Sequence, residues 1–448
     1  MANPYLEGLL APVTEEVTVH DLPVTGRIPS GLRGRYLRIG PNPLEIGDDS
    51  SYHWFLGDGM VHGIRLRDGR AEWYRNRWVR SQKVAENLGE RWPAGPVVED
   101  FDFAPNTHVI QHAGDTLALV EAGARPYRLD HELNTLGPCD FGGTLKGGYT
   151  AHPKEDPATG ELHAIGYFFG WEHLEYTVRS AAGEIVRSVE IPVPDGPMVH
   201  DFALTEKYVV IYDLPITFSM EMAEAGAGLP YTWNDAHPAR VGVMPRAGGA
   251  DDVRWIDIPP CWVFHTLNAY DDGDRVVVDL VRFPSFMHGG KLEGNPPPAL
   301  DRWTIDPAAG KAVQETIDDR AQEFPRMDER LVTRRHRYGY TVAENVAENV
   351  VGNEGGGGLM KHDYERGSAE TRLFPAGAGV GEAVFIPSAP DSAEDDGYLM
   401  TLAFDPARQA TDLVIIASQD FTGEPVATVH LPVRVPLGFH GSWAPDLG

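Results

Sequence analysis

The sequence predicts an all-β protein made of short strands, and two observations support this. The 448 residues include 49 glycines and 36 prolines, well above average usage and typical of a turn-rich chain. In addition, short apolar segments that follow Asp-Gly or Thr-Gly turns recur along the whole length, as successive β-hairpins would. Helical periodicity is sparse by comparison.

The expected hairpins follow one another along the chain. The first joins residues 61–66 to residues 71–79 across Asp68-Gly69. The other strands that adjoin turn residues are 162–169 after Thr159-Gly160, 275–283 after Asp272-Gly273, 398–404 after Asp396-Gly397, and 413–416 leading to 426–431 across Thr422-Gly423. No clear sequence repeat is visible, but hairpins spread over residues 1–448 favour one β-propeller domain, whose blades take about 40–50 residues each.

One segment departs from the strand pattern. Residues 216–228 contain Phe218, Met220 and Met222 among several alanines and glutamates. This composition predicts a short helix or an apolar lid that follows a strand. A surface excursion packed on its own domain is the alternative.

Charge and cysteine content limit the classes of partner and compartment. Asp and Glu outnumber Lys and Arg by 66 to 38, giving a formal charge of -28 that disfavours binding to nucleic acid. Cys139 and Cys261 are too few for a disulfide framework and are not spaced as a metal-binding pair, which favours the cytoplasm. No apolar stretch reaches the roughly 18 residues of a membrane span, so a peripheral surface patch is the expected form of any lipid contact.

Four histidines lie in distinctive local settings. They are His152 in Ala151-His152-Pro153, His200 in Met198-Val199-His200-Asp201-Phe202, His265 in Phe264-His265-Thr266-Leu267-Asn268, and His440 in Gly438-Phe439-His440-Gly441. Their wide separation is compatible with ligands from different blades that converge on a propeller axis. Four neutral imidazoles would hold a divalent transition metal and leave coordination positions open for dioxygen and substrate. The constellation therefore indicates an oxygenase.

Motifs along most of the chain resemble those of one family. They are Gly40-Pro41-Asn42-Pro43, Phe55-Leu56-Gly57-Asp58-Gly59-Met60-Val61-His62-Gly63, the four histidine motifs, Glu394-Asp395-Asp396-Gly397-Tyr398 and Arg434-Val435-Pro436-Leu437. In this order, from about residue 30 to the C-terminus, they closely resemble the carotenoid cleavage oxygenase family. The resemblance implies a seven-bladed β-propeller with a loop and helix dome over an axial Fe(II) held by His152, His200, His265 and His440.

The same resemblance implies three outer carboxylates. Glu121, Glu323 and Glu382 stand where the family has glutamates that orient its histidine ligands. A carboxylate that accepts the distal imidazole N–H fixes the tautomer of the ring and makes it a better metal donor. By contrast, we interpret His62 and His108 as structural, because unpartnered histidines usually are.

The implied activity is oxidative cleavage of a carbon–carbon double bond of a carotenoid or apocarotenoid, with dioxygen, to two carbonyl products. Phe169, Trp171, Phe202, Trp262 and Phe264 could line the apolar tunnel for this alkene, although packing between blades explains them equally well. Stilbene-cleaving members of the family have a lysine directly before the first outer glutamate, where this chain has Val120. Two alternatives stay open: cleavage of a stilbene or phenylpropenoid alkene, and a metal-bound propeller that binds apolar ligands without catalysis.

Overall fold

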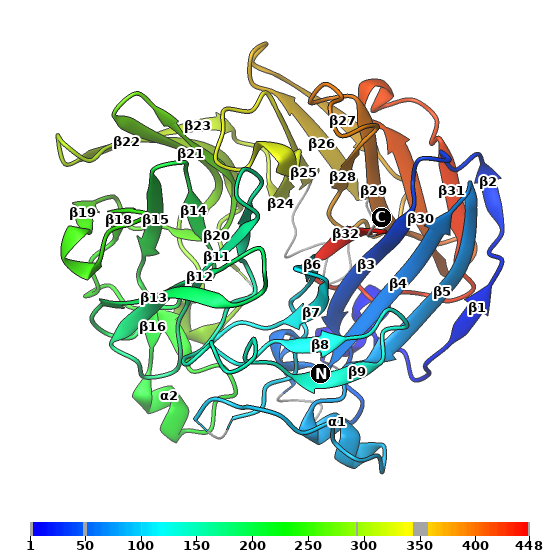
Figure 1. Cartoon of the computed structure of the whole chain (residues 1–448), viewed down its shortest axis with the longest axis horizontal. Coiled ribbons are helices and arrows are strands. Elements are labelled where there is room, and N and C mark those ends of the chain that lie inside the picture. Colours follow the sequence, from blue (N-terminus) through cyan, green and yellow to red (C-terminus); the bar gives the residue numbers. More distant parts are fainter. Residues whose placement is uncertain (1–2, 48–51, 100, 293, 344–356, 447–448) are drawn as a thin grey trace. The chain divides into compact units, whose positions relative to one another are not determined.

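The computed structural model describes residues 3–47, 52–99, 101–292, 294–343 and 357–446. Within these ranges the strands pair in seven sheets of four or five strands and one two-stranded sheet, as Figure 1 shows. The arrangement is a seven-bladed β-propeller, and the α-helices in the described ranges, α1 (Gln82–Asn87) and α2 (Met220–Glu224), are short. The predicted fold class is confirmed, whereas the predicted dome stays a prediction.

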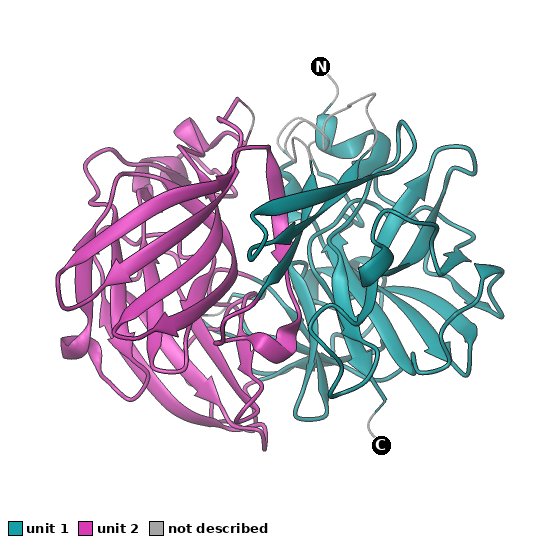
Figure 2. Cartoon of the chain, turned by 90° about the horizontal axis from the view of Figure 1, so that it is seen from above, with its two compact units in different colours: residues 1–120, 125–139, 337–448 teal, residues 121–124, 140–336 magenta. Residues whose placement is uncertain are grey.

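The chain divides into two compact units, coloured separately in Figure 2. Unit 1 consists of residues 1–120, 125–139 and 337–448, and unit 2 of residues 121–124 and 140–336. The expectation of one domain over residues 1–448 stays a prediction.

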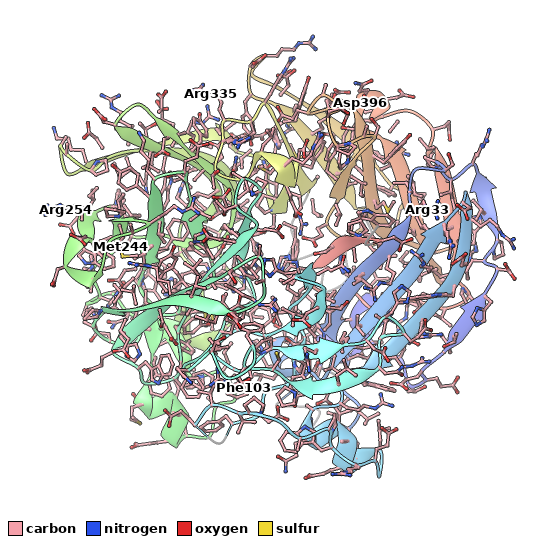
Figure 3. All side chains as sticks on the ribbon, viewed as in Figure 1. Arg33, Phe103, Met244, Arg254, Arg335 and Asp396 are labelled. Carbon is pink, nitrogen blue, oxygen red and sulfur yellow. The ribbon has the colours of Figure 1, made fainter. Side chains whose placement is uncertain are left out.

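Unit 2 contains three four-stranded antiparallel sheets. In order across each sheet, the strands are β10 (Lys154–Asp156), β11 (Glu161–Gly166), β12 (His173–Arg179) and β13 (Ile185–Pro192); β14 (Phe202–Leu204), β15 (Tyr208–Asp213), β18 (Arg240–Pro245) and β19 (Arg254–Asp257); and β20 (Trp262–Asp272), β21 (Arg275–Phe283), β22 (Ala299–Asp306) and β23 (Lys311–Asp318). Their central strands are buried on both faces, while the last strands, such as β13 and β23, consist mainly of partly buried and exposed residues. Met244 on β18 is accordingly buried and Arg254 on β19 is exposed, as Figure 3 locates them.

The segment that departs from the strand pattern forms a helical excursion of unit 2. β16 (Ile216–Phe218) pairs with β17 (Tyr231–Trp233), and α2 lies between them in sequence. Ser219 caps α2 by accepting a hydrogen bond from the Met222 amide. The predicted short helix after a strand is confirmed.

Unit 1 contains most strands of the remaining sheets. Their orders are β1 (Thr18–His20), β5 (Arg70–Trp78), β4 (Gly59–Arg67), β3 (Gly34–Pro41) and β32 (Gly441–Pro445); β6 (His108–His112), β7 (Asp115–Leu119), β8 (Tyr127–Leu129) and β9 (Thr135–Pro138); β24 (Gln322–Arg326), β25 (Tyr338–Ala343), β26 (Gly358–Asp363) and β27 (Ser368–Leu373); and β2 (Val24–Gly26), β31 (Ala427–His430), β30 (Ala410–Ala417), β29 (Gly397–Asp405) and β28 (Val384–Pro387). Two of these sheets join early strands to late ones, through β3 with β32 and β2 with β31. The pairing of β3 with β32 places His440, directly before β32, beside Ile39 on β3.

Local turn chemistry explains the hairpin between β4 and β5. Asp68 and Gly69 both have positive φ, 49° and 74°, as the type I′ turn of a two-residue hairpin loop requires. The resulting sheet packs its apolar face in a cluster with β29 and β30, in which Tyr36, Tyr74 and Leu413 are fully buried. The hairpin expected from residues 61–79 is therefore present.

The environment of His62 on β4 supports the interpretation of this residue as structural. It is buried, and its Nδ1 lies 2.9 Å from the Tyr74 hydroxyl. Burial, followed by the charges of Arg38 and Arg434, lowers the pKa of His62 to about 3. The ring is therefore neutral in the fold at any pH above this value.

This buried neutral ring should make the protein sensitive to mild acid. Below pH 6.5 the unfolded chain binds a proton at this position and the fold does not, so stability falls until the pH reaches the folded pKa. At pH 5 the loss from His62 should be about 2 kcal/mol. Urea unfolding at pH 7 and pH 5 measures it: His62→Gln should show a smaller difference between the two pH values. His20→Gln, at an exposed histidine, should behave as wild type, and an unchanged pH response in both variants would contradict the prediction.

No helix in the described ranges has the length and apolar character needed to cross a bilayer.

Candidate metal centre

Three of the four predicted histidines lie in unit 2, each at an edge strand of its sheet. His152 lies two residues before β10, His200 lies two residues before β14, and His265 is the fourth residue of β20. All three side chains are buried. The equivalent placement in three sheets brings their rings to one point.

The three rings lie against one another. The ring centroids of His152 and His200 are 4.3 Å apart, those of His152 and His265 5.1 Å, and those of His200 and His265 5.0 Å. The Nε2 atoms of His200 and His265 are separated by 3.2 Å. The structure thus brings together residues that are 48 to 113 positions apart in the sequence.

Carboxylates face the opposite sides of two of these rings. Nδ1 of His200 lies 2.7 Å from Oε1 of Glu121, and Nδ1 of His265 lies 2.6 Å from Oε2 of Glu323. With Nδ1 donating its proton to a carboxylate, the neutral ring carries its lone pair at Nε2. Both predicted Glu–His contacts within unit 2 are therefore present.

This arrangement fits a bound metal ion. Two lone pairs that face each other across 3.2 Å repel unless a cation lies between them. Two nitrogens about 2.1 Å from one metal ion and at right angles to each other lie about 3 Å apart. The chemistry of the donor set, all imidazole, suits a first-row transition metal.

The strand that carries His265 is irregular at this position. The pairing of β20 with β21 shifts register between Val263 and Thr266 and again between Thr266 and Asn268. Each shift inserts an extra residue on β20, and such bulges re-aim side chains next to functional sites. The double bulge explains how His265 departs from the regular alternation of the strand.

The fourth histidine is held in the same way within unit 1. Nδ1 of His440 lies 3.0 Å from Oε2 of Glu382, whose Oε1 accepts a 2.6 Å hydrogen bond from the Gly441 amide. Both side chains are buried, and Glu382 lies two residues before β28. The third predicted Glu–His contact is therefore also present.

The four histidines form a group that could hold a metal ion. One ring nitrogen each from His152, His200, His265 and His440 lies within 4.8 Å of the others, and all four residues are buried. No carboxylate belongs to the group. These are the four histidines that the sequence analysis singled out, and their role as metal ligands stays a prediction.

The Glu121 carboxylate is ionised although its side chain is only 20% exposed. Burial alone would raise its pKa, but its charge interaction and hydrogen bond with His200 and the hydrogen bond from Tyr167 outweigh burial and lower the pKa. The Tyr167 hydroxyl donates to Oε1 of Glu121 at 2.8 Å. Burial, and then the Glu121 charge, raise the pKa of Tyr167 well above its usual value, so the phenol keeps the proton that it donates.

Tyr167 and Phe324 are residues of the site that sequence analysis did not single out. The Phe324 ring is stacked on His265, with centroids 5.4 Å apart and an angle of 27° between planes. Phe324 has φ of 52°, a strained conformation for a bulky residue, and its amide donates to the Glu323 carboxylate. The sequence does not indicate that a residue other than glycine will adopt a positive φ at this position.

Aromatic side chains surround the three-histidine group in unit 2. The Phe264 ring lies edge-on to His200, with centroids 4.8 Å apart, and contacts Phe283 and Phe286. Phe169 contacts Phe218 and Tyr231 in the helical excursion. Of the predicted tunnel residues, Phe264 lies nearest to the histidines in these contacts. Phe264 therefore gives the His200 ring an apolar neighbour.

Comparison with known proteins identifies the family. Residues 10–445 match the family model described as retinal pigment epithelial membrane protein. The chain belongs to this family. Among curated members, it is 48% identical to the carotenoid cleavage oxygenase of Mycobacterium tuberculosis, over 99% of this chain and 98% of that protein. It is 34% identical to a carotenoid 9,10(9',10')-cleavage dioxygenase of Crocus sativus, over 97% and 88%, and 31% identical to the isoeugenol monooxygenase of Pseudomonas nitroreducens, over 99% and 98%.

Solved structures of similar proteins have the same fold. The lignostilbene dioxygenase of Pseudomonas brassicacearum superposes with a TM-score of 0.88 at 30% identity, covering 99% of this chain and 98% of that one. The cobalt-substituted apocarotenoid oxygenase of Synechocystis gives a TM-score of 0.86 at 29% identity, covering 97% of each chain. The family predicted from the sequence motifs is confirmed.

Proposed function

We propose that this protein is an Fe(II)-dependent dioxygenase that cleaves a carbon–carbon double bond of a carotenoid or apocarotenoid to two carbonyl products. The observation that carries the proposal is the buried group of four histidines, three of which contact a glutamate through Nδ1. The curated relative at 48% identity is a carotenoid cleavage oxygenase. The reaction balances without an external reductant, because one alkene and one dioxygen give two carbonyl groups.

In this proposal His152, His200, His265 and His440 are the metal ligands. Ferrous iron, when bound, would let ground-state dioxygen react with the alkene, whose double bond supplies the electrons that reduce both oxygen atoms. Four neutral ligands leave the ion with its full charge and with open positions for reactants. Cobalt substitution in the Synechocystis relative supports a site that accepts a first-row divalent metal.

The glutamates hold the ligands in place. Glu121, Glu323 and Glu382 each keep a proton on Nδ1 of one histidine and so direct its Nε2 lone pair to the metal. His152 has no such carboxylate among the three predicted. Tyr167 fixes Glu121 in turn by donating to the oxygen that faces His200.

Apolar residues position the substrate. The Phe264 ring beside His200 and the aromatic residues that it contacts offer a surface for an unsaturated hydrocarbon, which binds by burial rather than by hydrogen bonds. Water is excluded from the same surface. An alkene held there would meet dioxygen in a fixed orientation, which is the protein's main contribution to the rate.

A stilbene or phenylpropenoid alkene is the second candidate substrate. The isoeugenol monooxygenase and lignostilbene dioxygenase relatives favour it. Val120, directly before Glu121, argues against it, because an isopropyl group cannot bind the phenolic hydroxyl that a lysine would bind.

A substrate panel with oxygen measurement tests the proposal. Iron-loaded protein is incubated with apocarotenals, hydroxystilbenes and isoeugenol, while oxygen uptake and carbonyl products are measured by electrode and mass spectrometry. We expect one oxygen consumed per apocarotenal cleaved, with label from ¹⁸O₂ in the new carbonyl groups. Turnover of the phenolic alkenes alone would overturn the substrate class, and stoichiometric binding without oxygen uptake would favour a binding protein over an enzyme.

Compartment and other partners stay predictions. Cys139 and Cys261 are both buried free thiols, in keeping with the predicted cytoplasmic location. The predicted absence of nucleic-acid binding and the predicted peripheral contact with lipid rest on composition alone.

A further inference from the structure

We propose that Asp201 is a positioning residue that fixes the three histidine-bearing segments of unit 2 relative to one another. The inference rests on the proposed function, because it takes those histidines to be metal ligands. The ring nitrogens of His200 and His265 are paired with Glu121 and Glu323, and Asp201 takes no part in these pairs. It acts on the backbone that carries the rings.

The Asp201 carboxylate links all three segments. It directly follows His200 in the chain, and its Oδ1 lies 2.8 Å from Nζ of Lys154, two residues after His152. Its Oδ2 accepts a 2.7 Å hydrogen bond from the backbone amide of Thr266, the residue after His265. One side chain therefore connects the residues adjacent to each of the three ligands.

The hydrogen bond to Thr266 falls at the irregular part of β20. Thr266 lies between the two register shifts of the β20–β21 pairing, where the regular ladder is interrupted. A backbone amide in a buried bulge needs another acceptor, and Asp201 supplies it. The carboxylate thus stabilises the bulged conformation that directs His265 inward.

Burial makes these contacts costly to lose. The Asp201 side chain is 2% exposed and that of Lys154 19% exposed. Oδ1 also accepts a 2.7 Å hydrogen bond from the Phe202 amide, which fixes the carboxylate against the start of β14. Removing it would leave an ammonium and two amides without their buried acceptor, so the segments would have to rearrange to solvate them.

Metal binding should report this rearrangement directly. Ligands that shift relative to one another bind a metal ion less tightly, and loss of groups that orient ligands typically costs 10- to 100-fold in affinity. Asp201→Ala removes both acceptor atoms. Asp201→Asn keeps one oxygen and should lie between wild type and Asp201→Ala.

Asp279 provides a matched control. It is also fully buried, lies on β21, and is paired with Arg302 through two 2.7 Å contacts. Its side chain contacts Arg302 and His336, and neither of these residues is adjacent in sequence to a predicted ligand. The backbone of Asp279 pairs with Asn268 on β20, and the substitution keeps this pairing. Asp279→Asn therefore removes a buried charge from the same unit without removing a side-chain contact to the residues next to the ligands.

The experiment titrates Co(II) into the metal-free full-length protein and follows visible absorption bands and calorimetric heat. We expect a dissociation constant 10- to 100-fold higher for Asp201→Ala, a smaller increase for Asp201→Asn, and a value within about twofold of wild type for Asp279→Asn. Circular dichroism before each titration determines the folded fraction of each variant, so that equal concentrations of folded protein are compared. The positions of the absorption bands report the coordination geometry of the metal. General destabilisation of the protein would not shift them.

Two results would overturn the role of Asp201: wild-type affinity and spectrum in Asp201→Ala, or an equal loss of affinity in Asp279→Asn. A wild-type protein that binds no Co(II) would instead refute the metal site of the proposed function. The two failures are therefore distinguishable. Activity of the loaded enzyme is not needed for either.

Discussion

His265→Ala should abolish alkene cleavage and weaken metal binding by more than about 100-fold, beyond the range typical of outer-sphere substitutions. The substitution removes one of the four clustered imidazoles, and the same ring is the hydrogen-bond partner of Glu323. A metal ion in the variant would have three protein ligands and an extra open position, so it would bind weakly and without the imposed geometry. Co(II) titration and oxygen uptake with the substrate found in the panel measure the two effects.

The variant should also be less stable without metal. The Glu323 side chain is 3% exposed, and in His265→Ala its carboxylate loses the ring that it contacts at 2.6 Å. A buried ionised carboxylate without this partner is costly, so the unfolding midpoint should fall. Adding Glu323→Gln to the variant should recover part of this stability but none of the metal affinity.

His62→Gln is the matched control for this prediction. It also removes a buried histidine from a propeller strand, but its ring contacts the Tyr74 hydroxyl and belongs to no metal-binding group found among the described residues. We expect wild-type metal affinity and turnover. His265→Ala with affinity within tenfold of wild type would contradict the assignment of this residue as a ligand.

Local patterns in the sequence predicted much of the strand order. Turn residues such as Asp68 and Gly69 determine hairpins through their own backbone conformations, which depend little on distant residues. The number of blades was predicted from the family resemblance instead, because the hairpin patterns do not indicate how many sheets form the propeller. The two sheets that join early and late strands depend on pairings between residues 401 to 411 positions apart, which periodicity does not reveal.

The candidate site could be predicted as a set of residues, but not as a set of contacts. Motif resemblance identified four histidines and three glutamates, and the structure adds which glutamate faces which ring. Tyr167 and Phe324 were missed because their roles depend on the position of Glu121 and on a positive φ after Glu323. Asp201 was visible in its motif, yet its contacts with two other sheets appear only in three dimensions.

Removing the metal by anaerobic dialysis against a chelator should eliminate turnover, and Fe(II) alone should restore it. The proposed reaction needs no external reductant, because one alkene and one dioxygen give two carbonyl groups, so Fe(II) is the only addition that should be required. The metal-free protein should retain its β-sheet circular dichroism, because sheet pairing and apolar clusters such as the one around Tyr36 and Leu413 do not involve the four histidines. The blades thus provide a scaffold on which the ligands are already placed.

Stability should nevertheless respond to the metal. A ligand present at 100 times its dissociation constant stabilises the folded state by about 2.7 kcal/mol, so the thermal midpoint should rise as Fe(II) or Zn(II) is added. Zn(II) has no redox chemistry and should restore the midpoint without restoring turnover. A midpoint that does not change with either ion, or full turnover in the metal-free protein, would contradict the prediction. Recovery of stability by both ions but of activity by Fe(II) alone would separate the structural contribution of the four-histidine group from its chemical one.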